Sequence, residues 1–115
     1  LITDDQDFRD ELEETFDVSY SNEHQIEVEA QLFAVQLLFQ FLFSQGRLEQ
    51  AKSYILNQEE AIQNHRVIKN LLAMCYLYLS KYDIAKEMFE DLLNEDNSDV
   101  HALCHYTLLL YIIIF

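Results

Sequence analysis

The amino-acid sequence predicts an all-α protein. Among 115 residues there is one glycine and no proline, and half of the residues are hydrophobic. An all-β chain that turns every 8 to 12 residues needs many residues that tolerate positive φ or preset φ, and this chain has almost none. The length and the 24% of charged residues fit one small domain.

Charge limits the classes of partner. Seven Lys and Arg against 21 Asp and Glu give a formal charge of -14. Such a surface repels phosphate backbones and anionic lipid, so we expect neither nucleic acid nor membrane as a partner. Cys75 and Cys104 show no Cys-x-x-Cys spacing, and the chain starts at Leu1 without a signal-peptide pattern. These features favour a cytoplasmic protein and a fragment of a larger intracellular chain.

The acidic residues concentrate near the N-terminus. Residues 1–31 hold 11 of the 21 carboxylates and a single base, Arg9. We therefore expect a boundary near His24, between an acidic N-terminal segment (1–23) and a helical repeat domain (24–115).

Within the acidic segment, apolar residues recur at every fourth position, at Phe8, Leu12 and Phe16. This spacing predicts an amphipathic helix over residues 4–17. A partly disordered acidic arm fits the same composition and stays open as the alternative. Residues 18–23 are expected to form a connector.

The helices expected beyond His24 follow from apolar periodicity and turn residues. They cover residues 24–44, 47–61, 65–79, 82–94 and 98–115. Gly46 suits a tight turn that needs positive φ. Ser80 takes the corresponding place later in the chain, and its spacing to Asp83 predicts a capping box for the following helix. Ser98, followed by Asp99, is the predicted cap of the last helix.

The chain repeats itself with a period of 34 residues. Apolar or small residues recur at this offset in several columns: Leu48 and Tyr82, Ala51 and Ala85, Ile55 and Phe89, Leu38, Leu72 and Tyr106, and Leu42, Tyr76 and Leu110. The predicted repeats cover about 32–65, 66–99 and a partial third at 100–115, each built from a pair of antiparallel helices.

These columns resemble the tetratricopeptide repeat, whose pattern is W-x2-L-G-x2-Y followed by A-x3-F and a terminal proline. The second unit matches best, with Leu72, Ala73 and Tyr76 followed by Ala85 and Phe89. The first unit is looser, because bulky Phe39 stands where a small residue is expected. The third has only its first helix, and the proline is missing throughout.

The resemblance implies a TPR-like α-α superhelix of about two and a half repeats, which binds a peptide or partner helix in its concave groove. In the family's register this groove is lined by Phe33, Gln36, Gln40, Phe43, Val67, Asn70, Met74, Leu77, Tyr78, His101, Cys104 and Leu108. The expected function is a protein-interaction scaffold.

Two other functions stay open. One is a small acidic bacterial chaperone that shields an apolar client segment, and the other is the regulatory arm of an enzyme or transcription regulator. A branch of the family clamps the acidic C-terminus of heat-shock chaperones with groove Lys, Arg and Asn. The equivalent places here hold Gln36, Gln40, Asn70, Met74, His101 and His105. Since only Asn70 is of the required type, this ligand is rejected.

Catalytic and metal-binding patterns are weak. His101 and His105 stand at i, i+4 with Cys104 between them, but no fourth ligand and no His-Glu-x-x-His motif accompany them. A single glycine excludes the glycine-rich loops that bind phosphate. We expect no enzyme activity, no cofactor and no metal.

The last eight residues, Leu108 to Phe115, are all apolar. This run is shorter than the roughly 20 residues that cross a bilayer. It stops where the partner helix of the third unit would begin. We expect either a truncated repeat array or a homo-oligomer formed through this apolar C-terminal helix.

Overall fold

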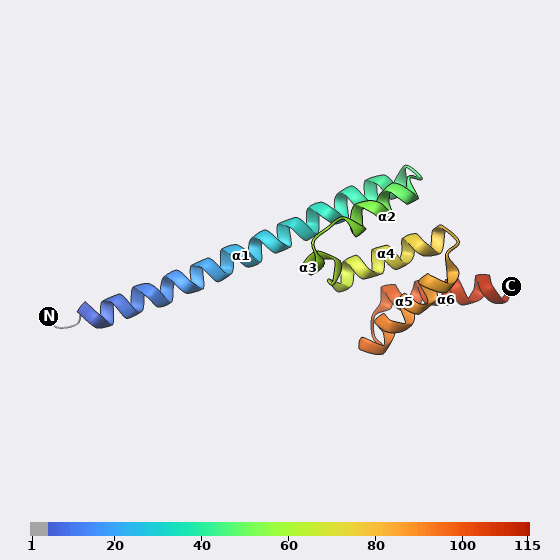
Figure 1. Ribbon diagram of the computed structural model, residues 1–115. Coiled ribbons are helices and arrows are strands. Elements are labelled where there is room, and N and C mark those ends of the chain that lie inside the picture. Colours follow the sequence, from blue (N-terminus) through green and yellow to red (C-terminus); the bar gives the residue numbers. More distant parts are fainter. Residues whose placement is uncertain (1–4) are drawn as a thin grey trace. The chain divides into compact units, whose positions relative to one another are not determined.

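The computed structural model describes the backbone from Asp5 to Phe115 and the side chains from Glu23 onward. Within these residues there are six helices and no strand, which confirms the all-α prediction. The helices are α1 (Asp5–Ser44), α2 (Leu48–Leu56), α3 (Glu60–Gln63), α4 (Arg66–Tyr78), α5 (Tyr82–Glu95) and α6 (Val100–Ile114) (Figure 1).

The chain divides into two compact units, 1–33 and 34–115. The first unit is described from Asp5 as one continuous helical segment. The connector predicted for residues 18–23 is therefore wrong, because the backbone stays helical through them. The side chains on which the amphipathic pattern of residues 4–17 depends lie outside the described residues. The contact-based division follows Phe33, whereas the sequence suggested a boundary near His24.

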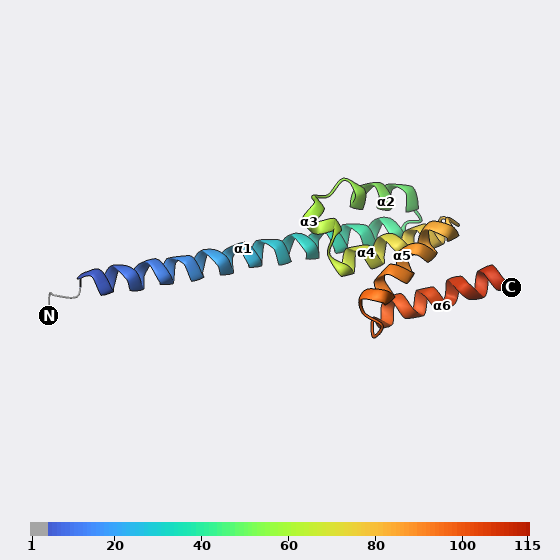
Figure 2. The ribbon, with the colours of Figure 1, turned by 60° about the horizontal axis from the view of Figure 1, so that its bottom comes forward.

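The second unit contains the end of α1 and the five helices that follow. Helix α2 returns alongside the last turns of α1 (Figures 1 and 2). Helix α4 packs against α2 and α5, and α5 packs in turn against α6. One core cluster joins α4, α5 and α6 through buried residues: Ala73, Leu77, Ala85, Phe89, Leu92, Ala102 and Leu109. The small side chains of Ala73 and Ala85 leave room for the helices to approach closely.

The turn before α2 and the turn before α5 have the same backbone geometry. Gly46 has φ 75° and Ser80 has φ 62°. The amide of Gly46 donates to the carbonyl of Phe43 (3.0 Å), and the amide of Ser80 donates to that of Leu77 (3.1 Å). The next amide along the chain donates to the carbonyl five residues before it, at 2.9 Å in both turns. Both are Schellman C-caps, 34 residues apart.

The capping box predicted at Ser80 is therefore wrong. Ser80 ends the preceding helix in the left-handed region, and Lys81 is the N-cap residue of α5, without a side-chain cap bond. The sequence suggested a capping serine because serine is common there. The 34-residue register with Gly46 decides against it.

The helix predicted over 47–61 is broken. Helix α2 ends at Leu56, and α3 begins only at Glu60. The side-chain amide of Gln63 donates to the carbonyls of Leu56 (3.1 Å) and Gln58 (2.7 Å), so it replaces helical hydrogen bonds at the break. The bend places Ile62 in the core at 2% exposure.

The last three predicted helices agree with α4, α5 and α6 to within two residues at each end. The cap of α6 differs from the prediction. Asp99 is the N-cap residue, and its carboxylate accepts from the amide of Ala102 at 3.1 Å. Ser98 instead donates from its hydroxyl to Asp96 at 2.6 Å, in a turn before the helix.

One stretch of α1, Glu23–Ser44, is long and apolar enough to cross a membrane by length and composition alone. It includes Val35 and Phe39, which are buried in the protein at 2% and 1% exposure. A core helix of a soluble protein passes the same test, so this stretch assigns no location.

Candidate functional site

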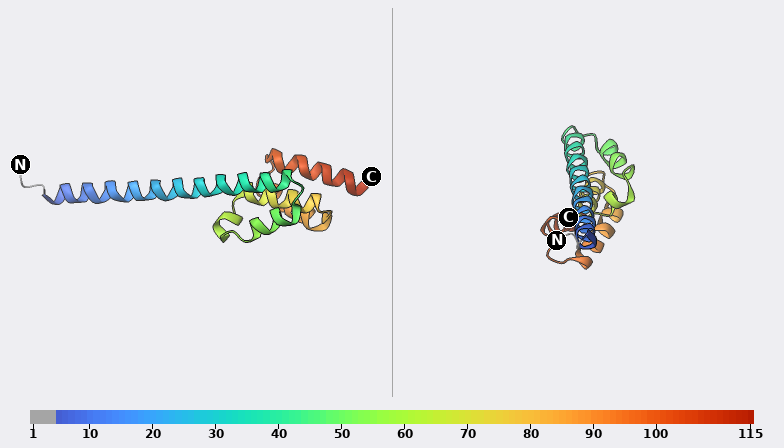
Figure 3. Two further views of the ribbon diagram at one scale, coloured as in Figure 1. Left: turned by 90° about the horizontal axis from the view of Figure 1, so that it is seen from above. Right: turned by 90° about the vertical axis from the view of Figure 1, so that its left-hand side faces the viewer.

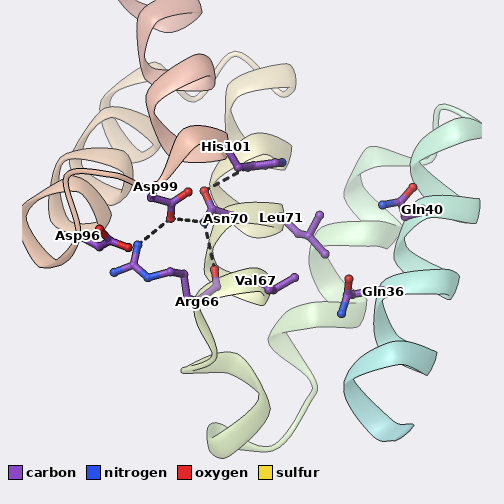
Figure 4. Close-up of a pocket in the computed structure, with 9 residues that line it drawn as sticks. All are labelled: Gln36, Gln40, Arg66, Val67, Asn70, Leu71, Asp96, Asp99 and His101. Carbon is purple, nitrogen blue, oxygen red and sulfur yellow. Dashed lines mark hydrogen bonds and ion pairs between the residues drawn. The ribbon is translucent and has the colours of Figure 1, made fainter. Parts of the chain in front are cut away.

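A pocket of about 410 Å³ lies within the second unit, between the end of α1, the first turns of α4 and the start of α6 (Figure 4). We call it the central pocket. Its lining residues are Gln36, Gln40, Arg66, Val67, Asn70, Leu71, Asp96, Asp99 and His101. Its volume is in the range of sites that hold small ligands or single anchoring side chains.

One wall of the central pocket is a network centred on Asp99. The Oδ2 atom of Asp99 accepts from Nη1 of Arg66 at 2.7 Å and from Nδ2 of Asn70 at 2.9 Å. Its Oδ1 atom accepts from the amide of Ala102 at the start of α6. Burial raises the pKa of Asp99, but these hydrogen bonds and the Arg66 charge outweigh it and hold the pKa below its usual value. Asp99 is therefore ionised at neutral pH.

Arg66 is fully occupied by this wall. Besides Asp99, its guanidinium donates to the carbonyl of Leu92 (3.1 Å) and to the carboxylate of Glu95 (3.0 Å). Two carboxylates thus neutralise its positive charge. The network ties the start of α4 to the end of α5 and the start of α6.

Asn70 carries the network to His101. The Oδ1 atom of Asn70 lies 3.2 Å from Nδ1 of His101. The His101 ring stacks on His105 with 4.4 Å between the ring centroids. Burial and the neighbouring His105 lower the pKa of His101, although Asp99 acts in the opposite direction. The imidazole is therefore neutral at pH 7.

Five of the predicted groove residues meet at the central pocket: Gln36, Gln40, Val67, Asn70 and His101. Figure 4 shows the two glutamines on the α1 side and His101 on the α6 side, with Val67 and Leu71 between them. The sequence register thus brought together residues from three helices that lie far apart in the chain.

The other predicted groove residues lie elsewhere. Phe43 and Tyr78 contact each other edge to face with ring centroids 5.3 Å apart, and Met74 is half-buried. Cys104 and Leu108 are exposed on α6. Phe33 is 63% exposed and belongs to the first unit.

Leu77 is not a groove residue. Its side chain is 3% exposed and lies in the core between α4, α5 and α6. The register placed it one position away from Tyr78, which is half exposed. Since both are apolar, the sequence alone did not separate the residue that faces the core from its exposed neighbour.

Sequence reasoning missed four pocket residues: Arg66, Leu71, Asp96 and Asp99. The available signal was charge. Arg66 is one of only seven basic residues, and it lies at the start of a predicted helix. An isolated base among 21 acids is a strong candidate for an ion pair, but its partner Asp99 is 33 positions away in the chain.

The two cysteines differ in environment. The Sγ atom of Cys75 is buried and lies 3.2 Å from the carbonyl oxygen of Leu48, to which the thiol donates. Burial raises its pKa to about 11, so this thiol is not a nucleophile at neutral pH. Among the residues from Glu23 onward, no three His, Cys, Asp or Glu side chains are placed to hold a metal ion.

No family model, curated protein or solved structure matches the chain. The functional argument therefore depends on the residues of the central pocket and on the internal repeat.

Proposed function

We propose that this chain is a TPR-like protein-interaction scaffold that binds a peptide or partner helix in the groove containing the central pocket. Two features support a TPR-like superhelix of about two and a half repeats. One is the 34-residue offset between the turns at Gly46 and Ser80, and the other is the alternation of helices along α2, α4, α5 and α6. In this proposal the protein is cytoplasmic and has no catalytic role.

The central pocket is the observation that carries the proposal. Its floor is apolar, formed by Val67 and Leu71, and its rim carries the amides of Gln36 and Gln40. A surface of this kind takes an apolar or aliphatic anchor and holds polar groups of the bound segment at its edge. Asn70 and Asp99 are rigidly bonded within the wall, so the pocket is formed before any ligand binds.

The test is a selection of random 12-residue peptides displayed on phage against the immobilised chain. The same selection is run on Val67→Asp, which places a charge on the pocket floor. The matched control is Ile84→Asp on α5. Val67 and Ile84 are both β-branched, and their side chains are 39% and 45% exposed, but only Val67 lines the central pocket.

We expect the wild type and Ile84→Asp to enrich the same peptides and Val67→Asp to lose them. Fluorescence anisotropy of a synthesised peptide should then give at least a tenfold weaker affinity for Val67→Asp, because a buried carboxylate without a partner is costly. Equal enrichment by all three proteins would contradict the proposal.

We also propose that two copies of the chain associate through α6. Residues 100–115 contain no Asp, Glu, Lys or Arg. Large apolar side chains on α6 are exposed, among them Leu103, Tyr111, Ile113 and Ile114 at 48%, 62%, 48% and 70%. Contiguous exposed apolar surface favours association, and this segment is free of the carboxylates that would make two acidic chains repel each other.

A further inference from the structure

The hydrogen bonds around Asn70 fix the proton on His101. The Nδ2 atom of Asn70 donates to the carbonyl of Arg66 (3.3 Å) and to Asp99 (2.9 Å), so both of its hydrogens are used. A flipped amide would place its oxygen against the Asp99 carboxylate, acceptor against acceptor. The Oδ1 atom of Asn70 therefore faces His101, and it can only accept. Consequently Nδ1 of His101 is the protonated nitrogen.

The neutral His101 ring then offers a lone pair at Nε2. In Figure 4 the ring extends from α6 over the central pocket, toward the side on which Gln40 lies. The carbonyl oxygens of the Gln40 and Gln36 amides are further acceptors on the opposite side. A bound group that reaches this end of the pocket must therefore supply hydrogen-bond donors.

The charge of the pocket favours a donor that is also positive. Arg66 is the only cation that lines the pocket, and Asp99 and Glu95 compensate its charge. Asp96 adds a further carboxylate to the lining, and the whole chain has a formal charge of -14. Such a field attracts a cation and repels an anion.

The floor of the pocket suits an aliphatic stem. Val67 is 39% exposed and Leu71 lies beneath it at 5%. Lysine and arginine side chains pack their methylene stems on apolar surface while the charged head contacts polar groups. Stem and head together match the floor and the acceptor end of the central pocket.

We propose that the central pocket selects a lysine or arginine side chain of the bound peptide, with Nε2 of His101 as its principal hydrogen-bond acceptor. This inference rests on the proposed peptide-binding function and names the chemistry of its ligand. Protonation of His101 replaces the acceptor with a donor and adds a positive charge. The groups that face His101 are Asn70 and Asp99 in the wall and His105 on the next turn of α6, and the glutamines on α1 carry no charge.

The experiment extends the phage selection to three more proteins. His101→Arg places a permanent cation at the acceptor, and His101→Phe keeps an aromatic ring but offers no acceptor. His24→Arg is the control, because it makes the same charge change at an exposed histidine that does not line the pocket. Far-UV circular dichroism confirms that each variant is folded before selection.

We expect lysine and arginine to be enriched at one peptide position by the wild type and by His24→Arg. Both His101 variants should lose this enrichment. For a synthesised peptide, replacing the selected lysine by norleucine should weaken binding to the wild type about tenfold or more at pH 7.5, the effect of one charged hydrogen bond. The same peptide should bind more weakly to the wild type at pH 5.0 than at pH 7.5.

The outcomes separate the two proposals. A wild-type pool identical to the Val67→Asp pool would refute the peptide-binding function and this inference with it. A specific wild-type pool without lysine or arginine would overturn the inference alone. Cation enrichment that persists in both His101 variants would also overturn it, since the -14 chain would then attract cations without using the pocket.

Discussion

Asp99 connects three parts of the second unit, so its replacement should be costly in a way that can be separated into components. Asp99→Ala removes the N-cap of α6 and both hydrogen bonds from α4. Asp99→Ser keeps a good N-cap oxygen for the amide of Ala102, but its shorter side chain does not reach Arg66 and Asn70. The difference between the two variants is the contribution of the cap.

The magnitudes follow from the contacts. Loss of an N-cap costs about 1 kcal/mol. Loss of the carboxylate leaves one Nδ2 hydrogen of buried Asn70 unpaired, which costs about 1 to 3 kcal/mol. Arg66 keeps Glu95 and the Leu92 carbonyl, so its own loss is small. We expect Asp99→Ser to lower the free energy of unfolding by about 1 to 3 kcal/mol and Asp99→Ala by about 2 to 4 kcal/mol.

Urea unfolding followed by near-UV circular dichroism of tyrosine measures this. Six of the seven tyrosines lie in residues 34–115, so the signal reports mainly on the second unit. Asp96→Ser is the control, because Asp96 is exposed and accepts only from Ser98; it should change stability by less than about 0.5 kcal/mol. If Asp99→Ser matched the wild type within about 0.5 kcal/mol, the network would contribute nothing beyond the cap.

Three further predictions concern the turns, α6 and pH. Ser80→Gly should stabilise the protein by about 1 kcal/mol in urea unfolding, because glycine adopts positive φ without cost. Gly46→Ala should destabilise it by a similar amount through φ alone, since an added Cβ would meet nothing within 4 Å. Analytical ultracentrifugation should show the wild type as a dimer at high concentration, with Tyr111→Glu as a monomer and Ile84→Glu unchanged. The lowered pKa of His101 means that the unfolded chain takes up a proton at a higher pH than the folded chain. The free energy of unfolding should therefore fall as the pH drops below about 6.5, and less so in His101→Gln.

Each of these has a contrary result. No gain from Ser80→Gly would mean that the serine side chain offsets the backbone cost at φ 62°. A wild type that stays monomeric at high concentration would refute association through α6. The same pH profile for the wild type and His101→Gln would show that other groups cause the acid loss of stability.

The sequence predicted the helices best where apolar periodicity and the 34-residue offset agreed. Helices α4 and α5 follow from that agreement. It failed where a residue type has two common uses. Ser80 was read as a capping residue, but in the structure it has positive φ. Asp99 and Ser98 are both good caps, and only the hydrogen bond to Ala102 identifies Asp99.

The candidate site was predicted in part for the same reason. Register placed Asn70 and His101 together, because both positions recur with the helix pattern. It could not pair Arg66 with Asp99, since an ion pair between separate helices leaves no periodic trace in the sequence. The break at Leu56 was missed because the amide of Gln63 ends that helix from seven residues away.

The matching turns at Gly46 and Ser80 determine the increments by which this chain can change in length. Residues 48–81 run from the start of α2 to the N-cap of α5, and Arg47 and Lys81 have nearly the same φ and ψ. A duplicate of this segment would join Lys81 to Leu48 in the geometry that Arg47 already provides. A single-residue insertion inside a helix would instead rotate the apolar face beyond it by about 100°. Gene duplication and protein engineering can therefore lengthen or shorten this protein by whole 34-residue segments, while smaller changes within its helices would be selected against.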